Sequence, residues 1–359
     1  MSPVAAVLAY RLGDTDGVSV EAAKWQWALE RLGFEVRRVA GSITDDPRTG
    51  DVEVPGLVIE PPPTVRADRD KVRAALEGCD LVVAENICSL PLNLDASEAA
   101  AAAIETHPGR VLFHHHDLPW QRAHLADIVE FPPRPPGALH ITINDRTRAE
   151  MAARDFIAYT IRNAFDFDQP LGDRDATRKE MGFDPDDLVL VQPTRAIPRK
   201  NVPGGLRFAG EVARRSDRTV RYWLTGPAED GYGPELERVL AETPVPVTRG
   251  RARSPGDLYA AADAIVLPSD WEGFGNPVVE AAWARKPLAV ADYPVLPEIT
   301  GLGLRTFPLD DPDRLARFLA DPDPELLEES LDAARRNFSL TDLPDRLRAV
   351  FVEHGWGDW

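Results

Sequence analysis

Two glutamates, Glu272 and Glu280, stand eight positions apart in the segment PSDWEGFGNPVVE. The apolar residues before it, 264–267, predict a buried strand, and a polar loop with two glycines follows. Asn276 is suited to the N-cap of the next helix, and Pro277 to its first position. Because the N–H groups at a helix start bind anions, we expect a phosphate there, with a carboxylate on either side to bind hydroxyl groups.

Each of these features also has a purely structural explanation. Glu280 in a first helical turn would stabilise the helix through its dipole, and Glu272 could be a solvated loop residue. Gly273 and Gly275 could simply shape a turn. The complete segment favours a ligand instead, namely one that carries a sugar, a diphosphate and a ribose in a row.

A pair of cations follows another predicted strand, residues 188–192. Arg195 and Lys200 stand five positions apart at the carboxyl end of that strand, where open parallel sheets bind their ligands. An arginine fork and a lysine point charge both suit a diphosphate. The alternative is a solvated basic loop. It is less favoured because the chain is acidic, with a net charge of −18.

Three consecutive histidines end a predicted strand at residues 111–115. Since successive side chains of a strand point to opposite faces, His114 and His116 could converge while His115 points away. A metal on these two nitrogens and Asp117 is the minor interpretation, because no further ligand cluster is near in the sequence. His115 is then a histidine satisfied in the core.

The segment from Glu272 to Glu280, together with the Arg195–Lys200 pair, closely resembles the E-x7-E signature of retaining family-4 glycosyltransferases, which have the GT-B fold. The resemblance implies that Glu272 contacts the hydroxyls of a donor sugar and that Glu280 binds the ribose. It also implies that Arg195 and Lys200 neutralise the diphosphate, and that His116 lies near the transferred sugar.

Other residues take roles from the same resemblance. Many family members have a Gly-Gly pair after the first strand, which this chain lacks, so only Gly17 is retained in that loop. The expected catalytic residues are His116, Arg195, Lys200 and Glu272. The expected donor-binding residues are Gly17, Gly226, Phe274, Gly275, Asn276 and Glu280. Possible acceptor or cleft residues are His114, Asp117, Trp120, Glu85 and Asn86, with packing in the domain interior as the alternative for Trp120.

The implied activity is retaining transfer of a sugar, by expectation a hexose, from a UDP- or GDP-sugar to an unidentified acceptor, without a metal or other cofactor. One alternative is a nucleotide-sugar epimerase or a phosphorylase of the same architecture. A phosphorylase would require a pyridoxal-phosphate lysine near the C-terminus, and no lysine follows Lys286. A non-catalytic sugar- or nucleotide-binding protein is the other alternative, against which the Arg195–Lys200 pair counts.

Apolar runs alternate with helical patterns along the whole chain, which predicts an α/β protein with parallel sheets. The resemblance implies two tandem Rossmann-like doubly wound domains that face a cleft. We expect an N-terminal, acceptor-side domain at 1–165, a nucleotide-sugar domain at 166–335, and a C-terminal helix at 336–359 that packs back on the first domain. Predicted strands are 4–10, 34–39, 81–84, 111–115, 140–144 and 156–161, then 188–192, 220–225, 245–247, 264–267 and 288–291. The polar, Pro-rich stretch 43–65 is expected to be exposed.

The composition of the chain excludes some classes of partner and indicates the cellular compartment. The 359 residues suffice for two domains, and no segment approaches the roughly 18 apolar residues of a membrane span. Only two cysteines occur and no signal peptide is visible, which favours the cytoplasm. The charge of −18 argues against nucleic acid as a partner. We therefore expect a nucleotide sugar and a small-molecule or glycan acceptor as partners.

Overall fold

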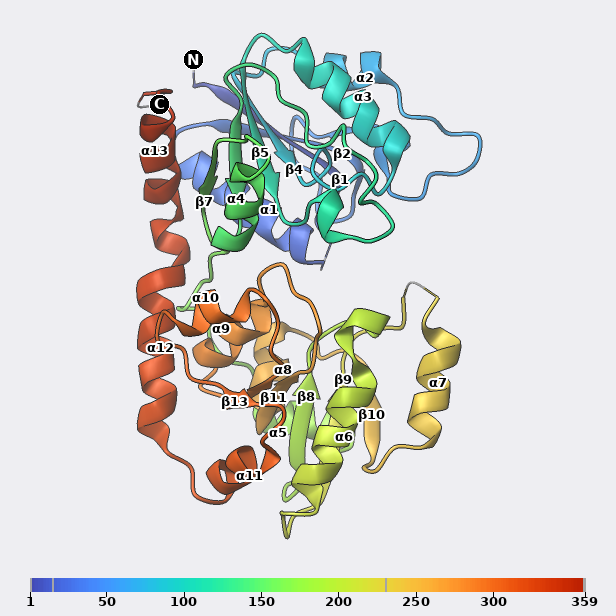
Figure 1. Ribbon diagram of the computed structural model, residues 1–359, viewed down its shortest axis with the longest axis vertical. Helices are drawn as coiled ribbons and strands as arrows, with labels where there is room; N and C mark the ends of the chain where they lie inside the picture. Colours follow the sequence, from blue (N-terminus) through green and yellow to red (C-terminus); the bar gives the residue numbers. More distant parts are fainter. Residues whose placement is uncertain (1, 15, 230, 358–359) are drawn as a thin grey trace. The chain divides into compact units, whose positions relative to one another are not determined.

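The chain folds into two compact units in the computed structural model, which describes residues 2–14, 16–229 and 231–357 (Figure 1). Unit 1 comprises Met1–Ala164 and Leu340–Trp359, and unit 2 comprises Phe165–Ser339. The chain thus leaves unit 2 after Ser339 rather than after 335, because helix α12 (Pro324–Phe338) continues past the expected boundary.

Unit 1 contains a seven-stranded sheet in the order β3-β2-β1-β4-β5-β6-β7, in which every neighbouring pair is parallel. Its strands are β1 (Val4–Leu12), β2 (Glu35–Ile43), β3 (Val52–Glu53), β4 (Leu81–Glu85), β5 (Arg110–His115), β6 (Leu139–Thr142) and β7 (Ala158–Thr160). Its helices are α1 (Gly17–Arg31), α2 (Arg69–Ala75), α3 (Leu94–Glu105), α4 (Asp145–Ala152) and α13 (Leu343–Glu353).

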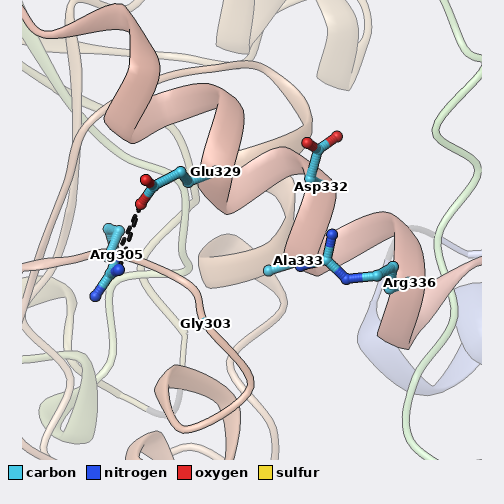
Figure 2. Close-up of a pocket in the computed structure, with 6 residues that line it drawn as sticks. All are labelled: Gly303, Arg305, Glu329, Asp332, Ala333 and Arg336. Atoms are coloured by element: carbon cyan, nitrogen blue, oxygen red, sulfur yellow. Dashed lines mark hydrogen bonds and ion pairs between the residues drawn. The ribbon is translucent and has the colours of Figure 1, made fainter.

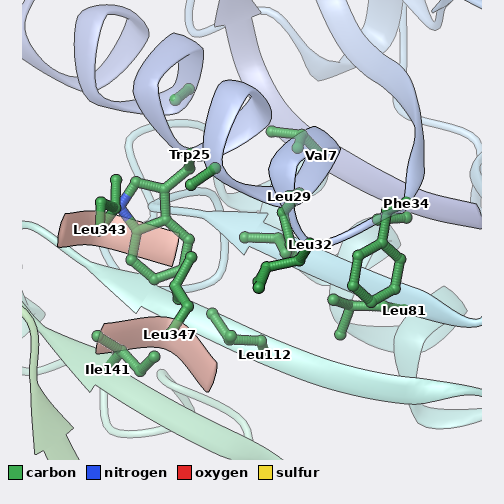
Figure 3. Close-up of a cluster of buried hydrophobic side chains, with 14 of the residues drawn as sticks. Val7, Trp25, Leu29, Leu32, Phe34, Leu81, Leu112, Ile141, Leu343 and Leu347 are labelled. Carbon is green, nitrogen blue, oxygen red and sulfur yellow. The ribbon is translucent and has the colours of Figure 1, made fainter. Parts of the chain in front are cut away.

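The strands of unit 1 are apolar on both faces, because helices cover both. Val7 of β1 packs in a cluster with side chains of α1 and α13, such as Trp25 and Leu347 (Figure 3). The next residue, Leu8, packs in a second cluster with α2 and α3. This alternation follows from the two-residue period of a strand, and it explains why these strands read as continuous apolar runs.

Unit 2 contains a six-stranded parallel sheet in the order β10-β9-β8-β11-β12-β13. Its strands are β8 (Leu188–Gln192), β9 (Val220–Leu224), β10 (Val247–Arg249), β11 (Ala264–Leu267), β12 (Leu288–Val290) and β13 (Phe307–Pro308). Its helices, besides α12, are α5 (Arg174–Met181), α6 (Val202–Ala213), α7 (Gly233–Ala241), α8 (Pro255–Ala261), α9 (Asn276–Trp283), α10 (Leu296–Thr300) and α11 (Pro312–Ala320).

The strand orders fix where ligands are expected. In unit 2 the chain runs outward from β8 through β9 to β10, and then returns to place β11 on the other side of β8. In unit 1 it changes direction in the same way between β1 and β4. Ligands of open parallel sheets bind at such switch points, outside the carboxyl ends of the two strands. The loops after β8 and β11 are therefore the first place to look in unit 2.

Every predicted strand overlaps a strand of the structure, but residues 43–65 differ from the prediction. Within them β3 adds to the edge of the sheet, and Leu57 is fully buried in the core. The buried guanidinium of Arg38 holds this stretch, since it donates to both carboxylate oxygens of Asp51 (2.9 and 2.6 Å) and to Asp45 Oδ1 (2.6 Å). The stretch is therefore anchored, and only part of it is exposed.

Among the described residues, none of the helices combines the length and the apolar character that crossing a membrane requires.

Candidate active site

The loops after β8 and β11 are bonded to each other at the switch point of unit 2. The backbone carbonyl of Arg199 accepts from Asp270 N (3.0 Å), and its guanidinium donates to Trp271 O (3.0 Å). Asn201 Nδ2 donates to Asp270 Oδ1 (3.1 Å). The structure thus brings together the two segments that the sequence singled out separately.

Lys200 and Glu272 form a buried ion pair within these loops. Lys200 Nζ lies 2.5 Å from Glu272 Oε1 and 2.6 Å from Oε2, and the two residues are only 8% and 7% exposed. Arg199 Nη1 lies 3.7 Å from the same carboxylate. Burial lowers the pKa of Lys200, and the negative charge of Glu272 opposes that shift. Lys200, which we expect to bind the phosphate, and Glu272, which we expect to bind the sugar, are therefore neighbours.

Arg195 has a different partner, Glu229, whose Oε2 lies 2.6 Å from its Nη1. Gly226 follows β9 and lies close to the backbone of the loop that carries Arg195, where there is no space for a side chain. A Cβ atom there would lie 2.4 Å from Thr194 O and 2.5 Å from Arg195 Cα. Gly226 thus allows the loop after β9 to approach the loop that carries Arg195. Glu229 could not be predicted as the partner of Arg195, because acidic residues are common in the loops of this acidic chain.

Helix α9 starts differently from the prediction. Its N-cap is Gly275, with φ of 97°, so Asn276 is the first helical residue and Pro277 follows it. A Cβ atom on residue 275 would lie 2.0 Å from the hydroxyl of Tyr293, which donates to Phe274 O (3.1 Å). Position 275 thus requires a glycine on two grounds, and Asn276 is the first residue of the helix rather than its cap.

Glu280 lies beyond the first turn of α9, since that turn contains no acidic residue. Its carboxylate accepts a hydrogen bond from the hydroxyl of Tyr259 (2.6 Å), which is buried in α8. Tyr259 fixes the direction of Glu280, whereas the helix dipole acts mainly within the first turn. Sequence reasoning missed Tyr259, because an aromatic residue in an apolar helix pattern looks like ordinary core.

In unit 1, the strand-end histidines converge on Glu85, because β4 and β5 are neighbours with Glu85 opposite His114. His114 Nδ1 lies 2.9 Å from Glu85 Oε1, and His116 Nε2 lies 2.5 Å from the same oxygen. All three side chains are buried. The backbone N–H groups of His116 and Asp117 both donate to Asn86 Oδ1 (3.2 and 3.4 Å).

The charges of this cluster follow from its geometry. Burial acts to raise the pKa of Glu85, but the two histidines outweigh it and lower the pKa to about 2. Burial acts to lower the pKa of His116, but the hydrogen bond and charge of Glu85 raise it above the usual value. Burial lowers the pKa of His114. Glu85 thus presents a carboxylate that accepts from both rings.

The same three residues are the one cluster in the described parts of the chain with metal-binding geometry, their ligand atoms lying within 4.8 Å of one another. In the minor metal interpretation Asp117 would be the third ligand, but in the structure it pairs with Arg122 (2.8 Å). A metal-bound histidine usually donates its second N–H to a carbonyl or carboxylate. His114 Nε2 is buried without a hydrogen-bond partner among the residues described, so a metal-bound His114 would find no acceptor there for its second N–H.

Two further predicted residues have local explanations. Trp120 is half-buried, its Nε1 donates to Glu150 Oε2 (3.1 Å), and its ring packs with Leu118. Gly17 is the first residue of α1, and a side chain there would meet nothing within 4 Å.

A pocket of about 300 Å³ lies elsewhere on unit 2 and contains none of the predicted site residues (Figure 2). Its lining consists of Gly303, Arg305, Glu329, Asp332, Ala333 and Arg336.

His115 faces the other side of the sheet, as predicted, and joins a buried pair. Its Nε2 lies 3.0 Å from His140 Nδ1, and its Nδ1 lies 2.7 Å from Ser89 Oγ. Burial lowers the pKa of His140 to about 3. The pair is therefore a structural element of unit 1.

The buried pair predicts a loss of stability on acidification. The unfolded chain protonates a histidine near pH 6.5, whereas folded His140 stays neutral down to about pH 3. The unfolded state thus binds more protons in this window, and the free energy of unfolding should fall by up to about 1.4 kcal/mol per pH unit as the pH drops below about 6. Denaturant unfolding of the parent and of His140→Gln at pH 7 and pH 5 measures this. The variant should show the smaller decrease, and equal decreases would contradict the assignment.

Comparison with known proteins bears on this site. Residues 173–334 match the glycosyl transferases group 1 family, which places the loops after β8 and β11 inside the matched region. Mannosylglucosylglycerate synthase of Thermotoga maritima is 26% identical, over 95% of this chain and 98% of that enzyme. The protein is a glycosyltransferase. The prediction of a glycosyltransferase, made from the Glu272–Glu280 segment, is therefore confirmed.

This chain is also similar to a second curated enzyme and to a solved structure. A D-inositol 3-phosphate glycosyltransferase of Rhodococcus erythropolis is 34% identical over 143 residues, which are 37% of this chain and 31% of that enzyme. Anabaena Alr3699/HepE, solved in complex with UDP and glucose, matches with a TM-score of 0.71 at 16% identity, over 98% of this chain and all of that one. This likeness confirms the GT-B fold of two Rossmann-like domains. The matches do not favour an epimerase.

Proposed function

We propose that this glycosyltransferase moves a hexosyl group, with retention of configuration and without a metal, from a nucleoside-diphosphate sugar to a small anionic acceptor. The donor binds to unit 2, and unit 1 supplies the acceptor side. The observation that carries the proposal is the clustering of Lys200, Glu272 and the start of α9 at the switch point of unit 2. Cations, a carboxylate and helix N–H groups are what a sugar diphosphate requires.

The chemistry follows from the charge that develops on the leaving group. When the bond between the sugar and the diphosphate breaks, negative charge grows on the phosphate oxygen, and a fixed cation stabilises that charge. Lys200 is buried, so its charge acts in a poorly screened environment. Arg195 adds a second cation on a more exposed side chain. These two residues perform the neutralisation for which other enzymes use a metal ion.

Retention of configuration requires that the acceptor attacks the face from which the diphosphate leaves. The acceptor hydroxyl forms the new bond to the anomeric carbon, the bond to the phosphate oxygen breaks, and that oxygen takes the hydroxyl proton. In this account Glu272 and Glu280 bind hydroxyl groups of the sugar and of the ribose, and neither acts as a nucleophile.

The choice of donor and acceptor class is supported by the relatives. The solved Anabaena protein holds UDP and glucose, which supports a nucleoside diphosphate and a hexose. A UDP-sugar or a GDP-sugar is the donor that we expect. The name of the Thermotoga maritima enzyme contains glycerate, and that of the Rhodococcus erythropolis enzyme contains inositol 3-phosphate. Both compounds are small, hydroxyl-rich and anionic. An acceptor of that chemistry is therefore proposed for this enzyme.

The proposal is tested by a panel of UDP, GDP and ADP and their hexose conjugates. The cognate nucleotide should raise the thermal unfolding midpoint, since a ligand at 100 times its Kd adds about 2.7 kcal/mol. The cognate conjugate should then release its nucleotide when a hydroxyl-rich carboxylate or phosphate is added, also after treatment with a chelator. If no nucleotide shifts the midpoint, the proposed function is wrong.

A further inference from the structure

Three tyrosine hydroxyls lie buried beneath the proposed donor site of unit 2. Tyr222, Tyr259 and Tyr293 are among the largest side chains that are fully buried. They come from β9, from α8 and from the segment after β12. A buried hydroxyl costs free energy unless it is hydrogen-bonded, and phenylalanine would fill the same space without that cost. The hydroxyls therefore call for an explanation in terms of what they contact.

The first hydroxyl acts on the loop that carries Lys200. Tyr222 donates to Gln192 Oε1 (2.6 Å), and Gln192 Nε2 in turn donates to Lys200 O (2.9 Å) and to Thr194 Oγ1 (3.0 Å). Gln192 is fully buried, so its amide has a single orientation set by these partners. A Cβ on Gly205 would lie 2.0 Å from the Tyr222 hydroxyl, so a glycine makes room for it.

The second and third hydroxyls act on the segment from Phe274 to Glu280. Tyr259 donates to Glu280 Oε2 (2.6 Å), and Tyr293 donates to Phe274 O (3.1 Å). Here too a glycine makes room, because Gly275 approaches the Tyr293 hydroxyl closely. Burial raises the pKa of all three tyrosines, so each hydroxyl remains a neutral donor.

We infer that these three hydroxyls are positioning groups for the donor site, each holding one of its elements in the geometry that binds the nucleotide sugar. The inference rests on the proposed function. Tyr222 positions the Lys200 loop for the diphosphate, Tyr259 positions Glu280 for the ribose, and Tyr293 positions the backbone at Phe274 for the sugar and phosphate. None of the three touches the reacting atoms.

The test removes each hydroxyl and keeps the ring. Tyr259→Phe should weaken binding of the cognate nucleoside diphosphate about tenfold, as expected for one lost hydrogen bond to a charged group. Tyr222→Phe should lower kcat about tenfold with a smaller change in the Kd of the nucleoside diphosphate. Tyr293→Phe should raise the KM of the nucleotide sugar more than the Kd of the nucleoside diphosphate. Calorimetry and steady-state kinetics measure these quantities.

Tyr10→Phe is the matched control. Its hydroxyl is also buried and lies 2.6 Å from Ser97 Oγ, but in unit 1. It should lower the unfolding midpoint as the other variants do and leave nucleotide affinity unchanged.

A double-mutant cycle separates positioning from general destabilisation. In a Glu280→Ala background, Tyr259→Phe should cause no further loss of affinity, because the group that it positions is gone. An equal tenfold loss in both backgrounds would overturn the inference, as would parental affinity and kinetics in all three single variants. A parent protein that binds no nucleotide would refute the proposed function itself, and the positioning roles with it.

Discussion

Lys200→Met should lower turnover by about 10²- to 10³-fold, the loss typical of removing one preorganised group that stabilises developing negative charge. The stabilisation by Lys200 grows as the diphosphate leaves, so the effect should fall mainly on kcat. Steady-state kinetics with the cognate donor measure it. The exposed Lys179, also in unit 2, supplies the matched control, since Lys179→Met removes a charge without altering the site.

The ion pair with Glu272 requires a second variant. Lys200→Met alone leaves a buried carboxylate without its cation, a change that costs about 3–5 kcal/mol of stability in comparable pairs. Lys200→Met combined with Glu272→Gln removes both charges and should recover much of that stability. It should not recover turnover. If the double variant works like the parent, Lys200 is a structural partner of Glu272 and not a ligand of the diphosphate.

His116→Ala should lower turnover about 10²-fold with nucleotide affinity unchanged, because the transition state loses a polar contact to the transferred sugar. The separation is expected because His116 belongs to unit 1, whereas the proposed nucleotide ligands belong to unit 2. Its ring is held by Glu85 and its backbone by Asn86. Kinetics and nucleotide titration on the same variant measure both quantities.

The exposed His124 is the control, and His124→Ala should behave like the parent. Parental turnover in His116→Ala would remove this histidine from the mechanism. A chelator should leave activity intact. If it abolishes activity and Zn²⁺ restores it, the Glu85, His114 and His116 cluster holds a metal, and the metal-free account is wrong.

Features of the site that depend on the residue pattern of one short segment could be predicted from the sequence. Strands β8 and β11 have the predicted bounds, because short apolar runs with clear flanking loops leave little choice. The convergence of His114 and His116 followed from the strand period, without knowledge of their partner. Glu85 lies 29 positions before His114, and only the pairing of β4 with β5 brings the two together.

Other features depend on contacts that a single sequence does not reveal. The N-cap of α9 is Gly275, where the Tyr293 hydroxyl leaves no space for a side chain, and nothing local in the sequence distinguishes this start from one capped by Asn276. Leu57 sits in a Pro-rich stretch that reads as an exposed loop, yet it is buried. Tyr259 reads as core, and its role becomes visible only through the carboxylate that it faces.

Calorimetric titration of Glu280→Ala and Glu272→Ala with the nucleoside diphosphate and with the nucleotide sugar tests the donor site most directly. Glu280→Ala should weaken both ligands alike, by about 1–3 kcal/mol, because the ribose hydroxyls lose their acceptor. Glu272→Ala should weaken the nucleotide sugar by a similar amount and should not weaken the nucleoside diphosphate, since only the sugar loses a partner and Lys200 stays available to the phosphate. If both variants bind both ligands as the parent does, the segment from Glu272 to Glu280 is only the start of a helix, and the donor lies elsewhere.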